Sequence, residues 1–279
     1  MICRDGEVVC EAYGDGGSAD SRWEIGSIRK SVCSTLLGGA IAEGLLSLDT
    51  PVYDVWPEIL TLGQEKDRAI LVRHLATNTS GWMLDHSAGD KWVYNNAACT
   101  AGNALVGRVY EMPDDRIAPL VTEKIASVIG TDWDCYHYDG AFEAGSHGQP
   151  GPKLAIDSTL RDLAKFGQLW LNEGKRDDRA VVPADYVREA RSNQCAHLDA
   201  HYGYWWFTND GRAQIPEAPE DAFYHIGHGR AYRRTLFLCI PSESLVVAIG
   251  THQQVFDIRC KTGRPTAGGF VRLSLHRSS

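Results

Sequence analysis

The sequence predicts an α/β protein of the α+β kind, with one antiparallel sheet built from both ends of the chain and a mostly helical lobe between them. Three observations lead to this prediction: strand-like residues at 2–10, strand-like residues again in the last third, and helical patterns in the middle. Each strand or helix must bury its apolar face against another layer. We therefore expect residues 1–26 and 200–258 to form one discontinuous lobe, and residues 27–199 to form the helical lobe.

Local signals mark the first elements. Asp5 and Gly6 lie between apolar residues, which is a strong signal for a two-residue hairpin turn. After Ser27, apolar residues recur at helical spacing as far as Glu43, and Gly44 is a natural stop. We therefore expect a hairpin at the start of the chain and a helix from residue 27.

The later elements are predicted in the same way. Residues 157–158 precede an amphipathic stretch that Gly174 would end, and Pro183 suits the first position of a third helix. Residues 259–279 contain several glycines and no apolar period, so we expect a poorly ordered tail. Strand-like stretches lie at 202–208, 235–240 and 245–250. A Pro-Ser-Glu-Ser turn joins the last two.

The composition excludes several classes of protein. The 279 residues include 28 Lys and Arg against 36 Asp and Glu, which gives a formal net charge of −8. Because there is no basic run, we expect neither a nucleic-acid partner nor binding to an anionic membrane surface. Apolar residues make up 43% of the chain, too many for a disordered protein. The longest apolar stretches are shorter than the ~18–20 residues that a membrane span needs.

The eight cysteines are scattered, without a Cys-x-x-Cys pair or zinc-finger spacing. In a chain of this length such residues are mostly small buried side chains, so we expect reduced thiols. The N-terminus has no apolar segment of the kind found in a signal peptide. Together these observations predict a cytoplasmic protein.

The first candidate for chemistry is the pair Ser27 and Lys30 at the start of the predicted first helix. Residues three apart share a helix face, so the lysine amine can reach the serine hydroxyl. A serine hydroxyl needs a nearby base to become a nucleophile, and the helix N-terminus offers N–H groups to an oxyanion. Because Ser-x-x-Lys also occurs by chance, a serine N-cap beside an exposed lysine is the plain alternative.

The second candidate is Tyr94 with Asn96, before a run of small residues. A phenol has an ordinary pKa near ~10 and becomes a base only where a cation favours the phenolate. Lys30 is the candidate cation. The alternative is a partly buried tyrosine and a helix-capping asparagine.

The third candidate is the segment from His225 to Gly229, just before the predicted strand at 235–240. A His-x-Gly element at a sheet edge would line a pocket and offer a backbone N–H to an oxyanion. The alternative is a turn with solvated histidines. Metal binding by His225 and His228 lacks an obvious third ligand.

Together and in this order, these segments resemble the serine β-lactamase and penicillin-binding-protein superfamily. The chain is most similar to the class C β-lactamase-like group, which includes family VIII carboxylesterases and 6-aminohexanoate-dimer hydrolase-type amidases. The resemblance covers residues 1–256 and implies a β-lactamase/transpeptidase-like fold. The matching segments are Ser27-Ile28-Arg29-Lys30-Ser31, the amidase-like stretch 34–46, the scaffold motif 73–81, Tyr94-Asn95-Asn96, the helix segment 161–167, and Gly227-His228-Gly229 with 236–241.

The chain departs from the family pattern in several places. Asn78 stands where a second histidine is usual, and Arg230 stands where a glycine often follows His-Gly. Counting back from the following turn favours His228 as the pocket residue, whereas His225-Ile226-Gly227 fits the spelling Lys-x-Gly better, so both frames stay open. The literal Lys-Thr-Gly at 261–263 lies too close to the end of the sequence and is interpreted as a coincidence. No helix before the first strand and no apolar C-terminal helix is visible.

The resemblance implies a serine hydrolase that forms an acyl-enzyme on small esters or amides. In this interpretation Ser27 is the nucleophile, and Lys30 and Tyr94 share proton transfer, with Lys30 keeping Tyr94 anionic or polarised. Asn96 orients Lys30 or the substrate. The remaining substrate-binding candidates are His225, His228 and Gly229, with a backbone N–H after His228 as the second oxyanion donor. Aromatic residues that would wall an acyl pocket, or else belong to the core, are Trp82, Trp92, Trp205 and Trp206.

Neither a metal nor an organic cofactor is implied, and the expected partner is a small-molecule ester or amide substrate. Two other functions remain open from the sequence. An acyltransferase would use the same serine with a different acceptor. A catalytically silent binding or sensor domain would keep the fold alone. The sequence leaves the physiological substrate and the oligomeric state open.

Overall fold

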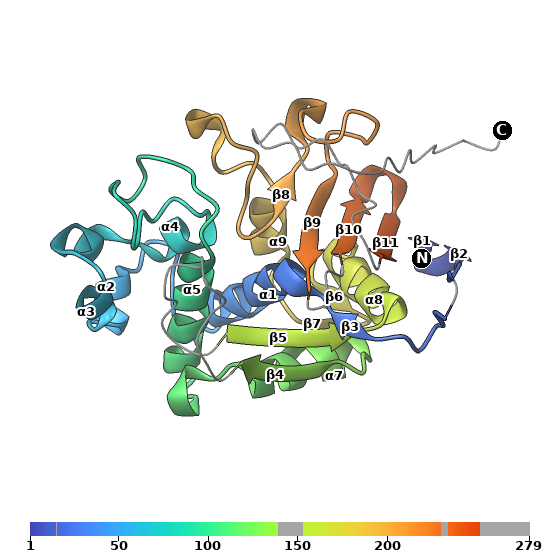
Figure 1. Cartoon of the computed structure of the whole chain (residues 1–279), viewed down its shortest axis with the longest axis horizontal. Coiled ribbons are helices and arrows are strands. Elements are labelled where there is room, and N and C mark those ends of the chain that lie inside the picture. The colour runs from blue at the N-terminus through green and yellow to red at the C-terminus, as the bar shows by residue number, and fades with distance from the viewer. Residues whose placement is uncertain (15, 139–152, 230–233, 252–279) are drawn as a thin grey trace.

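The computed structural model describes residues 1–14, 16–138, 153–229 and 234–251, and the account of the fold concerns these residues (Figure 1). Its larger sheet is antiparallel and has six strands in the order β2-β1-β11-β10-β9-β8. Both ends of the described chain contribute to it, which confirms the predicted fold class. The strands are β1 (Ile2–Arg4), β2 (Glu7–Cys10), β8 (Phe207–Thr208), β9 (Phe223–His228), β10 (Arg234–Ile240) and β11 (Leu245–Thr251).

The N-terminal hairpin forms as its turn residues predict. Asp5 and Gly6 have positive φ angles of 51° and 82°, the conformation that a tight two-residue turn requires. β1 then pairs with β11, with Cys3 opposite Val246. The beginning of the chain is therefore bound to the last described strand.

Helices pack on one side of this sheet and fill the region beyond it. The first long helix begins with a 3₁₀ turn at Gly26–Ile28 and continues as α1, Arg29–Ala42, so it starts where the sequence predicts. The other longer helices are α5 (Asn96–Val109), α8 (Leu160–Leu171) and α9 (Ala184–Ala190). Short helical segments are α2 (Val52–Val55), α3 (Ile59–Leu62), α4 (Val72–Ala76), α6 (Ala118–Val121) and α7 (Ser127–Ile129).

The middle of the chain also forms strands, which the sequence analysis did not anticipate. β4 (Asp134–Tyr138) and β5 (Lys153–Ser158) join β3 (Trp23–Glu24) in a three-stranded antiparallel sheet. A short pair, β6 (Lys175–Arg176) and β7 (Arg179–Ala180), follows α8. Residues 154–156 are a continuous buried apolar run, which periodicity cannot distinguish from a buried helix. The boundary between the two predicted lobes stays a prediction, and the predicted tail lies outside the described residues.

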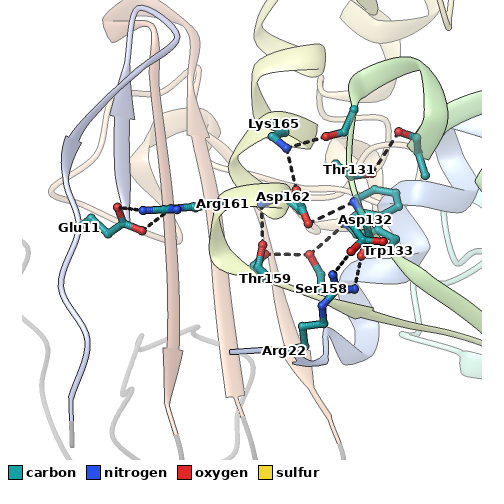
Figure 2. Close-up of polar contacts among 12 residues, drawn as sticks. Glu11, Arg22, Thr131, Asp132, Trp133, Ser158, Thr159, Arg161, Asp162 and Lys165 are labelled. Carbon is teal, nitrogen blue, oxygen red and sulfur yellow. Dashed lines mark hydrogen bonds and ion pairs between the residues drawn. The ribbon is translucent and has the colours of Figure 1, made fainter. Parts of the chain in front are cut away.

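The N-cap of α8 is Thr159, the residue that follows the pair 157–158 at the start of the predicted helix. The hydroxyl of Thr159, not that of Ser158, accepts the hydrogen bond from the backbone N–H of Asp162 at 3.0 Å (Figure 2). Ser158 instead accepts from the indole N–H of Trp133. On the exposed side, Arg161 binds both carboxylate oxygens of Glu11, at 2.7 and 2.9 Å. These contacts attach α8 to the segments that precede β3 and β4.

The core occupies both faces of the large sheet because side chains alternate along its strands. On the α8 face, the rings of Phe166 and Phe237 stack with centroids 5.8 Å apart, and Trp170 meets Trp206 at 4.7 Å. The opposite face buries a second apolar cluster built on Tyr224, Leu236, Leu238, Ile240 and Val247. In the described ranges no helix is long and apolar enough to cross a membrane.

Candidate active site

The start of α1 carries the predicted nucleophile and its lysine. The amine of Lys30 donates to the hydroxyl of Ser27 at 3.0 Å, as the spacing of three residues predicts. Ser27 is partly exposed, whereas Lys30 has no exposed surface. A reactant can therefore reach the hydroxyl but not the amine behind it.

The second predicted segment lies beside this pair, at the N-terminus of α5. The carboxamide oxygen of Asn96 accepts a hydrogen bond from the Lys30 amine at 2.7 Å. The same amine lies 4.7 Å from the centre of the Tyr94 ring. The helix is capped by Asn95, whose side-chain oxygen accepts from the N–H groups of Ala97 and Ala98. Ser27, Lys30, Tyr94 and Asn96 thus meet at one place, although 63 residues or more separate the two segments in sequence.

Burial makes Lys30 a base. Complete burial, assisted by the positive charge of neighbouring Arg29, lowers the pKa of Lys30 from its ordinary value to about 7. A large fraction of the amine is therefore neutral at neutral pH. A neutral amine 3.0 Å from Ser27 is placed to accept the hydroxyl proton.

Burial favours the neutral form of Tyr94. Burial raises the pKa of the Tyr94 phenol well above its ordinary value, and a hydrogen bond with the Ser27 side chain offsets this only in part. Of the two expected states, anionic or polarised by Lys30, burial opposes the anionic one. Low-dielectric surroundings disfavour the phenolate more than the Ser27 hydrogen bond and the charge of Arg29 favour it. Tyr94 is a neutral phenol, which donates a proton rather than accepts one.

The two histidines of β9 lie on opposite faces of the strand. His225 is completely buried, with its ring 6.4 Å from the Tyr94 ring and 5.3 Å from the Phe207 ring. His228 is exposed. The expectation, from the spacing to the next turn, that His228 is the pocket residue is therefore not met, because His225 is the histidine that lies beside Tyr94. Since side chains alternate along a strand, His228 then points to the other face.

The backbone of β9 approaches the start of α1 closely. A β-carbon on Gly26 would lie 2.4 Å from the carbonyl oxygen of His228, and one on Gly227 would lie 2.0 Å from that of Ile25. A β-carbon on Gly229 would lie 2.2 Å from the carbonyl oxygen of Glu24. Gly26 also has a φ of +57°, which glycine adopts without strain. The glycines thus bring the His228 backbone next to Ser27.

Of the four tryptophans named as pocket or core residues, only Trp92 lies in the aromatic wall beside Tyr94. Trp82, Trp205 and Trp206 are at most 1% exposed and belong to the core. Trp92 is half-buried, 6.4 Å from Phe207, and Phe207 stacks on Tyr94 with ring centroids 5.9 Å apart. The aromatic stretch 202–208 was a signal for Phe207, but the sequence analysis used it only to predict a strand.

The imidazole of His225 bears on metal binding and on the charge of the site. Among the described residues there is no group of three or more His, Cys, Asp or Glu side chains that would hold a metal ion. Burial lowers the pKa of His225 well below its ordinary value, and the charge of Lys30 adds to this effect. His225 is therefore a neutral imidazole beside Tyr94.

Comparisons with known proteins show the family to which the chain belongs. The model of the protein family described as Beta-lactamase matches residues 1–263. The 6-aminohexanoate-dimer hydrolase of Paenarthrobacter ureafaciens is 22% identical over 260 residues, which cover 77% of this chain and 65% of that protein. The chain thus spans about two thirds of that relative.

Two solved structures share the fold at low sequence identity. A putative beta-lactamase from Bacteroides dorei has a TM-score of 0.66 and 18% identity, covering 90% of this chain and 84% of its own. A D-stereospecific amidohydrolase from a Streptomyces species also has a TM-score of 0.66 and 18% identity, covering 86% and 84%. At this identity the likeness establishes the fold.

Proposed function

Because the chain belongs to the Beta-lactamase family, we propose that it is a serine hydrolase that forms an acyl-enzyme on small esters or amides. The observation that carries the proposal is the position of the Lys30 amine. It is buried, its pKa is lowered to about 7, and it binds Ser27 at 3.0 Å and Asn96 at 2.7 Å. A lysine held in this way serves as the base that activates a serine.

Acylation proceeds by attack of the Ser27 oxygen on the substrate carbonyl carbon while the Lys30 amine takes the hydroxyl proton. Asn96 orients the amine by accepting a hydrogen bond from it. The tetrahedral intermediate places its oxyanion between the N–H groups of Ser27 and His228, since the His228 backbone lies against Gly26. As the carbonyl re-forms, the neutral phenol of Tyr94 protonates the leaving alcohol or amine and recovers a proton from the Lys30 ammonium.

Deacylation repeats these steps with water as the nucleophile. The Lys30 amine, neutral again, removes a proton from the water directly or through Tyr94. The water attacks the acyl carbon, and the Ser27 oxygen leaves and is reprotonated. One acid is released in each cycle, and the enzyme returns to its starting protonation state.

The neutral side chain of His225 on β9 supports esters and linear amides as substrates. His225 stands beside Tyr94 as a neutral imidazole, so the charge of an ammonium is missing at this position. The name of the curated relative, a 6-aminohexanoate-dimer hydrolase, supports the same class. We expect turnover of short-chain aryl esters and weak or absent turnover of cephalosporins. A kcat/KM for a chromogenic cephalosporin above that for an aryl acetate would contradict this preference.

A fluorophosphonate probe tests the proposed nucleophile. Mass spectrometry of the labelled protein should locate the adduct on Ser27 alone, and Ser27→Ala should lower kcat by several orders of magnitude while thermal unfolding stays near wild type. Ser127→Ala is the control, because Ser127 is an exposed serine on α7, away from the site. An adduct on Ser80 or Ser158, or full activity of Ser27→Ala, would contradict the proposal.

A further inference from the structure

Asn78, on the segment between α4 and α5, holds both neighbours of Tyr94. Its backbone carbonyl accepts from the N–H of Val93 at 3.0 Å. Its side-chain oxygen accepts from the N–H of Asn95 at 3.2 Å. Both residues next to Tyr94 therefore donate a hydrogen bond to Asn78.

Asn95 extends this attachment to the rest of the site. Its side-chain N–H donates to the carbonyl of Trp82 at 2.9 Å, while its side-chain oxygen caps α5. Asn95 thus contacts the scaffold, whereas its neighbours Tyr94 and Asn96 contact the Lys30 amine. Segment 78–82 therefore attaches residues 93–95, which carry Tyr94, to the scaffold.

The residue type at position 78 suits this task. Asn78 is 1% exposed and has a φ of +59°, a left-handed conformation that asparagine adopts more readily than most side chains. In this conformation its carbonyl and its carboxamide oxygen both meet the 93–95 segment. An apolar residue here would leave the half-buried N–H of Asn95 without this acceptor.

We propose that Asn78 is a positioning residue, which keeps the Tyr94 hydroxyl at Ser27 for proton transfer. The proposal rests on the proposed serine hydrolase function. Asn78 itself touches neither Ser27 nor Lys30 through any hydrogen bond seen in the described part of the chain. Its effect on catalysis must therefore pass through Tyr94 and its neighbours.

The test is a double-mutant cycle between positions 78 and 94, with an aryl ester as substrate. Asn78→Gly removes the side chain, and glycine adopts the left-handed backbone conformation of this position without strain. We expect kcat to fall by ~10-fold or more, with KM changed less than ~3-fold. In the Tyr94→Phe background, Asn78→Gly should cost less than ~2-fold further, because the hydroxyl that it positions is already absent.

Two further variants complete the experiment. The control is Asn103→Ala. Asn103 is also a buried asparagine but lies within α5, and its replacement should leave kcat near wild type. Asn78→Ser replaces Asn78→Gly if the glycine variant does not fold, because its side chain is too short to reach Asn95. It should likewise lower kcat in the wild-type background but hardly in the Tyr94→Phe background.

The outcomes separate this proposal from the proposed function. Equal losses from the position-78 change in both backgrounds, or no loss in either, would overturn the positioning role while Ser27 still reacts with the fluorophosphonate. Tyr94→Phe with wild-type kcat would overturn it as well. Turnover by Ser27→Ala would instead show that the proposed function has failed.

Discussion

A β-carbon on Gly26 would lie 2.4 Å from the carbonyl oxygen of His228. This close approach brings the backbone of β9 beside the residue that precedes Ser27. Two peptide N–H groups, of Ser27 and His228, can face one oxyanion only if nothing separates the two segments. The absence of a side chain at position 26 is thus a requirement of the site and not only of the turn.

Gly26→Ala should therefore be more damaging than an ordinary change at a left-handed glycine. The strain of a positive φ costs about 1–2 kcal/mol, and the contact with His228 adds to it. Gly44→Ala is a matched control, because Gly44 has a φ of +73° but nothing within 4 Å of the added carbon. We expect a larger fall in Tm and a much slower fluorophosphonate reaction for Gly26→Ala. Equal Tm changes and equal labelling rates would contradict the role of the close approach.

The activity should depend on pH through Lys30. The base must be neutral to accept the Ser27 proton, and its pKa is lowered to about 7. The value of kcat/KM for an uncharged aryl ester should therefore rise with pH to a plateau, with a midpoint near 7. Lys30→Arg should lose at least ~1,000-fold, because a guanidinium stays protonated. A flat profile across pH 5.5–8.5 would show that another group is the base.

Lys30 should also limit the stability of the protein. Its pKa falls from 10.5 to about 7 on folding, so between these values the unfolded chain binds more protons and stability rises with pH. Lys30→Met removes the buried amine. We expect it to raise the free energy of unfolding at pH 7 by about 1 kcal/mol or more. The advantage over wild type should shrink as pH rises toward 10, which urea denaturation at pH 7 and 9.5 would measure. A destabilised Lys30→Met at pH 7 would contradict this prediction.

The two histidines should differ in their effect on catalysis. His225 is buried beside Tyr94, so His225→Ala removes a neighbour of the catalytic phenol and should lower kcat/KM for an aryl ester by at least ~10-fold, or ~1.4 kcal/mol of transition-state stabilisation. His228 contributes its backbone, which alanine retains, so His228→Ala should cost less than ~3-fold. The reverse ranking would restore His228 as the pocket side chain.

Local rules were sufficient for much of the site. The spacing of Ser27 and Lys30 on one helix face, and the hairpin at Asp5 and Gly6, depend on neighbours in sequence and are found as predicted. The sheet with strands from both ends followed from the same kind of pattern. By contrast, β4 and β5 were not predicted, because neither segment has a strand-like pattern of its own. Each becomes a strand through its pairing with the other.

By itself the sequence determined which residues meet: Ser27 and Lys30 by helix periodicity, and Tyr94 and Asn96 by their resemblance to a family motif. Only the tertiary structure decided what they do. Burial sets the neutral amine of Lys30 and the neutral phenol of Tyr94, and the pleat of β9 turns His225 rather than His228 toward the site. The hydrogen bond from the Asn95 N–H to Asn78 joins residues that are 17 positions apart. These properties depend on dielectric and on contacts between distant segments, and neither is encoded in the local pattern of the chain.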